Sequence, residues 1–562
     1  MFRILLHLKH MQKDICFIEN YRDIGLVSRL KNFSEILFIP LNLETFIFCK
    51  KKKFKIFDFK KNISSEFHKK AQKSSKEFTD KIGFNFKLNY SLKAEIIFFL
   101  RFRFNSILLI SEIIKKIKKE TNINKIIVSG LKKKYHKNLH DGNLITEIVE
   151  SLYRNEIEIT RLSNEEHHEV IPIIREYVPN ICMKSHSKNV LLGNAGYNFK
   201  RIINILNKKK VKVWIPFFEK LSLPYKIFYF FYGFKPIEFK KTENKIIIKQ
   251  YIEKIDFKYE TYNLSTLLNN FYQKLNFYFN DLEQKSIALK KLINNNKFSL
   301  TISNIVKGIN GSILDNDIKC NTLCVSHGII TKSYDEYDEI YKKIIAEAVF
   351  GGESKYFAIQ SKIMNDSLKT HKLFGKPIVT GNIVFSSIKN NFPKNNYVLQ
   401  ASTVKDFTNL QFLGVEMFYE YWDHLLIIDN LAKKNNLNVL VKPHPTIKNC
   451  IGDLKKNFKN INFSNKSIDR LLKKASLLIS YSSSSIEDAL NSNIPVILFE
   501  KKKRYIHLKP FENMKINSAV TYLNSEENLI KQIKKNKYNS KYNFDQYIYK
   551  QNNTEKNILS LI

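Results

Sequence analysis

Two short segments near the end of the chain contain residue types that can bind phosphate. The first is the tetrapeptide 442–445, with the sequence KPHP, and the second is the serine run 482–485. Because proline cannot continue a central strand, the chain must leave its sheet at the first segment. There the imidazole of His444 can donate a hydrogen bond to a phosphate oxygen, and Lys442 adds positive charge. The alternative is an ordinary strand exit whose histidine is merely exposed.

The serine run lies between an apolar, strand-like stretch and a helix-like stretch. Serine hydroxyls and the free N–H groups at the start of a helix can together bind an anion. Glu487 lies three residues after Ser484, so the two residues could instead form a capping box, which is a purely structural role. Such a box would not need all of the serines.

Strand-like runs precede both segments and recur through the C-terminal part of the chain. They cover residues 397–401, 438–441, 477–480, 494–498 and 519–522, separated by helix-like stretches such as 419–434 and 467–474. Strands that alternate with helices predict a parallel sheet covered by helices, and this series is long enough for a Rossmann-like domain. An earlier series of such runs lies between residues 122 and 359. We therefore predict an α/β fold in which two Rossmann-like domains face a cleft, where ligands bind at the carboxyl ends of the strands.

The domain boundaries follow from changes in composition. We predict an N-terminal domain over residues 1–390, a C-terminal domain over residues 391–535 and a tail over residues 536–562, with the linker in a polar, proline-containing stretch. Residues 1–120 are lysine-rich and aromatic, and they predict helix or irregular structure rather than strands.

The charge of the chain has two explanations. The formal net charge is +40 over 562 residues, and 44% of the residues are hydrophobic, which is typical of a globular protein. The charge can reflect a composition rich in lysine, asparagine and isoleucine, or it can attract an anionic membrane or a phosphorylated substrate. Since no helix-turn-helix, RRM or zinc-finger pattern occurs, we expect no nucleic acid as a partner.

Targeting and metal signals are weak in this sequence. The six cysteines are scattered without a CxxC pair, so we expect neither a disulfide framework nor a zinc site. The apolar stretch at the N-terminus is too short for a signal peptide. The sequence contains no long uncharged apolar run, so we expect no transmembrane helix. We expect a cytoplasmic protein, either free or in peripheral contact with the inner face of the membrane. The aromatic run Phe228–Phe234, between Lys226 and Lys235, suits either a lipid interface or a packed core.

The order and spacing of the motifs resemble a known family. The sequences KPHP (442–445), SSSSIEDAL (482–490) and NIPVILFE (493–500) together resemble the C-terminal donor domain of GT-B glycosyltransferases of bacterial surface polysaccharide biosynthesis. The groups that they resemble are the capsule Kdo-transferases, the bacterial sialyltransferases and the CDP-glycerol glycerophosphotransferases. Upstream, segments 324–328, 356–361 and 377–382 are similar to elements of the N-terminal domain, and the last also resembles UDP-GlcNAc 2-epimerases. The resemblance covers roughly residues 298–522.

The resemblance implies a glycosyltransferase that moves a sugar from a nucleotide-activated donor to a surface polysaccharide or glycolipid, such as capsule or lipopolysaccharide. It favours a CMP-sugar as donor. Since no Asp-x-Asp-like metal motif occurs in a plausible place, we expect metal independence, and we expect no cofactor. His327 is the implied catalytic base, and Gly328, Gly381 and Asn382 are implied cleft or hinge residues. The implied donor-binding residues are Lys442, His444, Pro445, Ser482, Ser483, Ser484 and Glu487. The alternatives are a CDP-glycerol-type polyol-phosphate transferase, a UDP-GlcNAc 2-epimerase-like enzyme and a basic nucleic-acid-binding protein.

Overall fold

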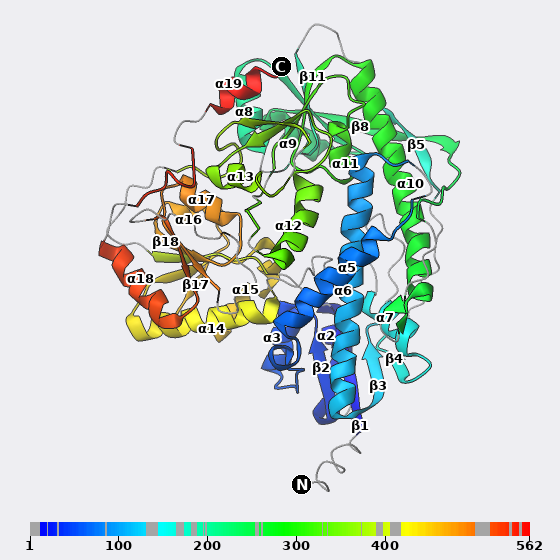
Figure 1. Cartoon of the computed structure of the whole chain (residues 1–562), viewed down its shortest axis with the longest axis vertical. Helices are drawn as coiled ribbons and strands as arrows, with labels where there is room; N and C mark the ends of the chain where they lie inside the picture. Colours follow the sequence, from blue (N-terminus) through cyan, green and yellow to red (C-terminus); the bar gives the residue numbers. More distant parts are fainter. Residues whose placement is uncertain are drawn as a thin grey trace.

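The strands of the computed structural model form three larger sheets and one short hairpin (Figure 1). The structure describes residues 12–19, 21–30, 33–84, 87–130, 144–163, 173–180, 188–194, 196, 199–252, 258–259, 262–326, 328, 330–333, 335–371, 374–388, 397–404, 417–500, 508, 518–538, 542–549 and 553–562. In Figure 1 the N-terminal sheet is blue to cyan at the bottom, the central sheet is green at the top, and the C-terminal sheet is yellow to red on the left.

The C-terminal sheet has six parallel strands in the spatial order β17-β16-β15-β18-β19-β20. This is the order of a doubly wound Rossmann sheet, in which the chain reverses direction across the sheet beside the first strand. The strands are β15 (Tyr397–Gln400), β16 (Val439–Val441), β17 (Asn462–Phe463), β18 (Ala475–Ser480), β19 (Val496–Phe499) and β20 (Val520–Leu523). The helices are α14 (Phe418–Asn435), α15 (Ile451–Asn457), α16 (Ile468–Leu472), α17 (Ser485–Asn491) and α18 (Glu526–Tyr538). The strands and the helix α14 predicted for this region are confirmed.

The central sheet has eight strands in the order β14-β13-β12-β11-β6-β7-β8-β5. Apart from β5, which is antiparallel to β8 at one edge, its pairs are parallel and the order is again that of a Rossmann sheet. The strands are β5 (Arg175–Pro179), β6 (Asn189–Leu192), β7 (Lys212–Phe217), β8 (Lys235–Lys245), β11 (Phe298–Ser303), β12 (Asn321–Cys324), β13 (Tyr356–Ile359) and β14 (Lys376–Val379). The helices are α8 (Lys200–Lys208), α9 (Leu223–Tyr232), α10 (Ser265–Asn295), α11 (Gly308–Gly311), α12 (Glu336–Val349) and α13 (Lys362–Ser367). The predicted α/β fold with two Rossmann-like domains is confirmed.

The N-terminal part of the chain forms a third sheet, which the sequence analysis did not predict. Its order is β2-β1-β3-β4 and its pairs are parallel. The strands are β1 (Gln12–Ile18), β2 (Ile36–Pro40), β3 (Asn122–Val128) and β4 (Glu158–Arg161), and the helices are α2 (Tyr21–Val27), α3 (Leu43–Lys51), α4 (Phe59–Asn62), α5 (Ser65–Asp80), α6 (Tyr90–Glu120) and α7 (Leu144–Tyr153). The expectation of helix or irregular structure was therefore wrong for β1 and β2. The run at residue 122, predicted for the first Rossmann series, also belongs to this sheet.

Helix α6 contains the apolar stretch 96–110, which is interrupted by Arg101 and Arg103. In the structure it is a buried helix, and Arg101 within it donates from Nε to the hydroxyl of Ser75, 2.9 Å away. Across the residues that the structure describes, no helix is both long enough and apolar enough to cross a bilayer.

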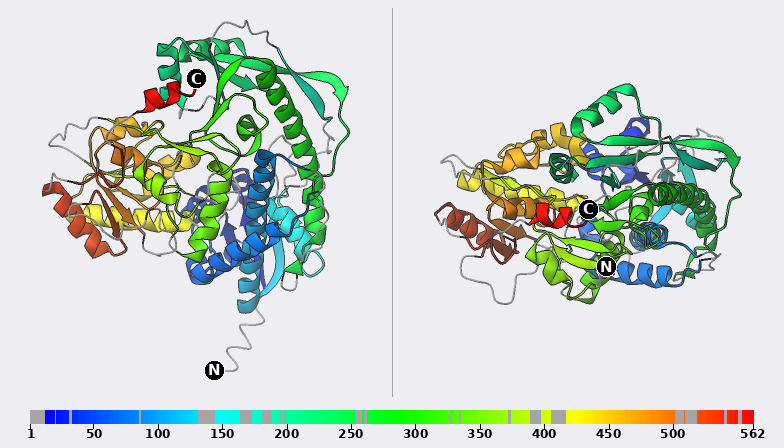
Figure 2. Two further views of the ribbon diagram at one scale, coloured as in Figure 1. Left: turned by 45° about the horizontal axis from the view of Figure 1, so that its top comes forward. Right: turned by 90° about the horizontal axis from the view of Figure 1, so that it is seen from above.

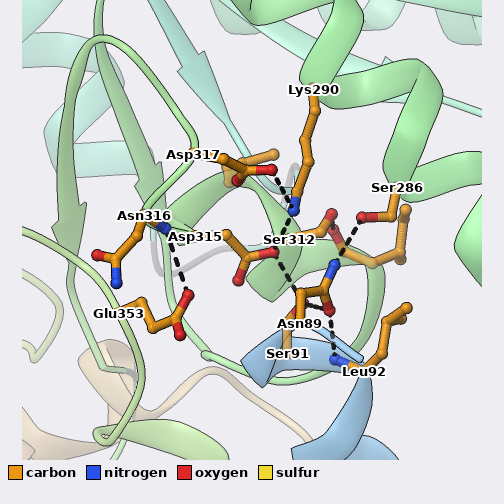
Figure 3. A network of polar contacts seen from close by, with 12 residues as sticks. Asn89, Ser91, Leu92, Ser286, Lys290, Ser312, Asp315, Asn316, Asp317 and Glu353 are labelled. Carbon is orange, nitrogen blue, oxygen red and sulfur yellow. Dashed lines mark hydrogen bonds and ion pairs between the residues drawn. The ribbon is translucent and has the colours of Figure 1, made fainter. Parts of the chain in front are cut away.

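The start of α6 is tied to the central sheet by a polar network (Figure 3). The side chain of Asn89 accepts a hydrogen bond from the backbone N–H of Leu92 at 3.0 Å and caps the helix. Ser91 donates to Asp315 at 3.3 Å, and Lys290 on α10 lies 2.9 Å from the carboxylates of both Asp315 and Asp317. Because these bonds join segments far apart in the sequence, they hold the N-terminal unit against the central one.

The N-terminal unit also packs on the C-terminal one. The ring of Phe46 on α3 lies 5.6 Å from Phe418 and 5.7 Å from Trp422, and Phe59 stacks on Tyr419 at 5.2 Å. The N-terminal unit thus contacts both Rossmann-like units, and Figure 2 shows its helices and strands in two further views.

The end of the chain returns to the central sheet. Helix α19 (Thr554–Leu559) buries Ile558 in the core beside β6 and β7. The hydroxyl of Thr554 donates to the carbonyl of Thr380 at 3.0 Å, and Asn321 donates to the carbonyl of Leu561 at 2.8 Å. The end of the predicted tail, residues 553–562, therefore packs on the central unit.

Candidate functional site

The two predicted phosphate-binding segments lie at one edge of the C-terminal sheet. Strands β16 and β18 flank β15 and run parallel to it, so their carboxyl ends meet there. The backbone N–H of Lys442 donates to the carbonyl of Gln400 at 2.8 Å, and the N–H of Thr403 donates to the carbonyl of Ser482 at 2.8 Å. These bonds hold both segments beside the end of β15, where ligands of doubly wound sheets bind.

His444 is oriented by the turn that follows it. Pro445 starts a short 3-10 helix, η4 (Pro445–Cys450), and His444 caps it by accepting the backbone N–H of Thr446 at Nδ1, 3.4 Å away. The hydroxyl of Thr446 lies 2.8 Å from the same nitrogen. With Nδ1 as the acceptor, the neutral ring carries its proton on Nε2. This N–H can donate a hydrogen bond to a ligand.

Lys442 lies half-buried at the same edge. Burial lowers the pKa of its ammonium, whereas the nearby carboxylate of Asp488 opposes this shift. An anion that binds next to a partly desolvated cation stabilises it, because the anion replaces the hydration that the cation has lost.

The predicted capping box does not form. Ser484 precedes α17, but its side chain makes no capping hydrogen bond and is exposed. Instead, the hydroxyl of Ser483 accepts the backbone N–H of Ser485 at 3.2 Å. The carboxyl group of Glu487 is fully buried and does not reach back to the start of the helix. The alternative that Glu487 serves as the acid of a capping box is therefore wrong.

Five polar side chains near this edge are buried without a partner for their oxygen atoms among the described residues. The atoms are Gln400 Oε1, Ser480 Oγ, Ser482 Oγ, Ser485 Oγ and both carboxyl oxygens of Glu487. Each of these side chains is less than one-tenth exposed. Buried polar groups are almost always hydrogen-bonded, and leaving one unpaired costs about 1–3 kcal/mol. Such a concentration is typical of a place that takes up a polar ligand or water.

The two acids of α17 have strongly perturbed pKa values. Burial, together with the neighbouring Asp488, raises the pKa of Glu487 to about 8. Burial also raises the pKa of Asp488 to about 7, even though Asp488 accepts the backbone N–H of Ser386 at 2.7 Å. At neutral pH Glu487 therefore carries a proton and can donate a hydrogen bond.

The residues predicted for the central unit follow strands β12 and β14 in the sequence. His327, the predicted base, lies outside the described residues, but Ser326 before it donates to the carbonyl of Gly328 at 2.9 Å. Gln360 donates to the carbonyl of Ser326 at 2.7 Å and accepts the backbone N–H of Ile383 at 3.1 Å. A Cβ added at Gly328 would meet nothing within 4 Å among the described residues, and the cleft or hinge role of this glycine remains a prediction.

Gly381 and Asn382 shape the turn that leads to the linker. Gly381 has a φ of +69°, which glycine adopts without strain. The side chain of Asn382 closes the turn by bonding both backbone groups of Phe385, at 2.8 and 2.9 Å. The turn then delivers Ser386 to Asp488, so the linker is anchored on α17. This position fits the predicted hinge, whose motion remains a prediction.

Sequence reasoning missed several residues of this edge. Gln400 ends an apolar run without any motif, and Ser480 and Asp488 were part of quoted segments but were not singled out. Gln400 and Ser480 share one signal, a polar residue at the end of a strand-like run, whereas Asp488 lies within α17. No group of three or more His, Cys, Asp or Glu side chains suited to a metal ion occurs in the described part of the chain.

Comparisons with known proteins give no family. No protein-family model matches the chain, and no curated protein matches it. Among solved structures, the calicheamicin glycosyltransferase CalG4 matches at 10% identity and a TM-score of 0.37, over 67% of this chain and 95% of that one. A putative UDP-N-acetylglucosamine 2-epimerase from Listeria monocytogenes matches at 11% identity and a TM-score of 0.37, over 67% and 95%. A variant of the wall teichoic acid polymerase TagF soaked with CDPG matches at 14% identity and a TM-score of 0.39, over 67% and 88%. At these values the similarity carries no argument about activity.

Proposed function

We propose that this protein is a glycosyltransferase that binds a nucleotide-activated donor at the carboxyl edge of its C-terminal sheet. The observation that carries the proposal is the concentration of buried, unpartnered oxygens on Gln400, Ser480, Ser482, Ser485 and Glu487 beside the half-buried Lys442. A ligand with phosphate oxygens and ribose hydroxyls would supply both the anion and the hydrogen-bond donors that this edge lacks.

The proposed reaction transfers the sugar to a hydroxyl of a surface polysaccharide or glycolipid. A base takes the proton of the acceptor hydroxyl, the acceptor oxygen bonds to the anomeric carbon, and the bond from that carbon to the donor phosphate breaks. Lys442 and the Nε2–H of His444 would stabilise the charge that grows on the leaving phosphate. We assign the base to His327, on the resemblance of segment 324–328 described above.

A protonated Glu487 suits this site better than a carboxylate would. A neutral acid does not repel a phosphate, and it can donate a hydrogen bond to a carbonyl of the base or to a ribose oxygen. Its ionisation, centred at a pKa of about 8, would add a negative charge beside the donor. Donor affinity should therefore fall as the pH rises through this value.

The donor is the part of the proposal with a direct rival. The resemblance favours a CMP-sugar, while a CDP-glycerol-type donor would make the protein a polyol-phosphate transferase on the same fold. In that case the acceptor oxygen attacks the β-phosphorus and CMP leaves. Both donors carry a cytidine and phosphate, so the same edge serves either reaction.

A thermal-shift screen tests the proposal directly. The purified chain is heated with CMP, CDP, UDP or GDP and with the sugar and glycerol conjugates of these nucleotides. A ligand at 100 times its Kd stabilises the folded state by about 2.7 kcal/mol. The expected result is a selective shift with a cytidine nucleotide that is lost in Lys442→Met and kept in Lys448→Met, which removes an exposed lysine of the following turn.

The same screen contains the outcomes that contradict the proposal. If no nucleotide shifts the melting temperature, or if the shift is equal in Lys442→Met and the parent chain, the proposed donor site is wrong. Steeply salt-dependent binding to DNA of any sequence, without a nucleotide shift, would instead favour the nucleic-acid alternative.

We also propose that the enzyme works on the cytoplasmic side of the membrane, in peripheral contact with anionic lipid. The support is the net charge of +40 and the lipid-linked nature of the proposed acceptor. No metal or cofactor enters the proposed reaction.

A further inference from the structure

Helix α9 exposes more large apolar side chains than it buries. None of its ten residues is buried. This is unusual because α9 follows β7, which is an interior strand of the central sheet. Leu223 is 69% exposed, Ile227 50%, Phe230 71% and Phe231 83%. We propose that these four side chains, the α9 stripe, form the surface that docks this protein on an anionic lipid bilayer.

The four side chains lie on one face of the helix. Their spacing of four, seven and eight residues from Leu223 places them along a single stripe. On the other side of the helix Tyr229 and Tyr232 pack against the core of the central sheet, whereas Tyr225 and Phe228 are 58% and 55% exposed. The ring of Tyr229 stacks on Phe217 at 5.2 Å and lies 4.7 Å from Phe234. The helix therefore cannot turn its apolar stripe inward without losing these contacts.

Pro224 and Gly233 define the two ends of α9, and the second end contacts α8. Pro224 occupies the first turn, where its missing N–H costs nothing. Gly233 ends the helix with a φ of +88°, and a Cβ at this position would lie 2.1 Å from the side-chain nitrogen of Asn207. Asn207 also donates to the carbonyl of Gly233 at 2.9 Å. The exposed stripe is therefore a feature of an anchored helix.

Basic residues surround the stripe. Between residues 208 and 235 the chain has seven lysines and one acid, Glu219. The bond between Asn207 and Gly233 places the end of α8, with Lys208–Lys210, beside the end of α9. The exposed lysines of this border are Lys208, Lys209, Lys210, Lys212, Lys220 and Lys235. Figure 1 shows α8 and α9 together in the upper part of the molecule.

This combination fits a lipid surface. Aromatic and aliphatic side chains with a lysine border can enter the boundary between headgroups and acyl chains, while the lysines contact anionic headgroups. A helix of ten residues is about 15 Å long, which suits a position in the plane of the interface. A second copy of the chain is a poorer occupant, because it would bring the same lysines face to face. The assignment rests on the proposed peripheral location and deepens it.

Vesicle binding of the full chain tests the α9 stripe. Vesicles of phosphatidylcholine, with and without phosphatidylglycerol, are sedimented with the parent chain, with Phe230→Ser/Phe231→Ser and with Ile247→Ser. Ile247 is the control, because it is also exposed, at 89%, but lies far from the stripe. It follows β8, a strand of 11 residues that starts next to α9, which places it roughly 40 Å from α9 along the strand. We expect binding only to the anionic vesicles, weakened about tenfold or more in the double variant and unchanged in Ile247→Ser.

A second variant reports the position of the helix. Phe231→Trp should bind like the parent chain and should lose fluorescence with vesicles that contain brominated lipid, beyond the loss from the native Trp214 and Trp422. Anionic vesicle binding that persists in Phe230→Ser/Phe231→Ser would overturn the assignment of α9 while leaving the peripheral location intact. No binding of the parent chain would overturn both. If the double variant instead loses self-association, measured by light scattering, the stripe is an interface between copies. Nucleotide binding should be the same in all of these variants, so failure of the membrane surface and failure of the donor site give different results.

Discussion

Replacing Glu487 by glutamine should change how stability depends on pH. The folded pKa of Glu487 is about 8, whereas an unperturbed glutamic acid has a value of 4.5. Because the folded pKa is raised, the stability linked to this proton is fully present below pH 4.5 and is lost as the pH rises through about 8. Between pH 5 and pH 8 the parent chain should lose on the order of 3 kcal/mol that Glu487→Gln keeps. The amide has nearly the same shape, so packing should change little.

Urea unfolding at several pH values measures this difference. The chain has two tryptophans, Trp214 in the central sheet and Trp422 on α14 of the C-terminal unit. In a Trp214→Phe background the fluorescence of Trp422, which is 6% exposed, reports the unit that contains Glu487. The quantity of interest is the stability of Glu487→Gln minus that of the parent, compared between pH 5 and pH 8.

The expected difference grows with pH, in favour of the glutamine variant. A difference that stays constant from pH 5 to pH 8 would refute the reasoning, because Glu487 would then be ionised in the folded chain or already paired. A nucleotide that accepts a hydrogen bond from the acid should bind more weakly above pH 8 to the parent chain and show no such loss in Glu487→Gln.

Four further substitutions follow from the structure. His444→Ala should abolish transfer, measured by product formation, while leaving the melting temperature unchanged. Lys442→Met should weaken nucleotide binding, measured by titration, by about 10–100-fold. Lys290→Met should leave the 3% exposed carboxylate of Asp315 hydrogen-bonded to Ser91 but without its cation, at a cost of about 3 kcal/mol at pH 8. The cost should be smaller at pH 5, because burial already raises the pKa of Asp315 to about 6; equal costs at both pH values would contradict this. Ile558→Ala, at a fully buried position of α19, should destabilise the central unit by about 2–5 kcal/mol in urea unfolding, and a loss near zero would show that the returning helix contributes nothing.

The local pattern of the sequence predicted most of the C-terminal unit. Buried parallel strands are apolar on both faces, so β16 and β18 appear as short apolar runs, and the proline and serine residues that end them mark the carboxyl edge. The sheet order of a doubly wound fold then places these ends together. For this reason the two phosphate-binding segments could be predicted to share one edge before any contact was known.

The N-terminal sheet could not be predicted in the same way. Its strands β1 and β2 lie among lysine-rich, aromatic stretches, and β3, which pairs with β1, follows β1 by more than a hundred residues. Pairing at that separation leaves no local pattern, so only the folded chain shows that β3 belongs to this sheet and not to the next one.

The chemistry of the site was decided by tertiary contacts. Whether Glu487 caps a helix or holds a buried proton depends on the desolvation around it, and the bond from Ser386 to Asp488 joins residues that are 102 positions apart. The same holds for α9, whose aromatic run reads equally well as core or interface, and only the packing of Tyr229 shows which face remains exposed. Sequence determines which residue types end each strand, because that depends on neighbours along the chain. Burial and pairing depend on neighbours in space, which only the tertiary structure supplies.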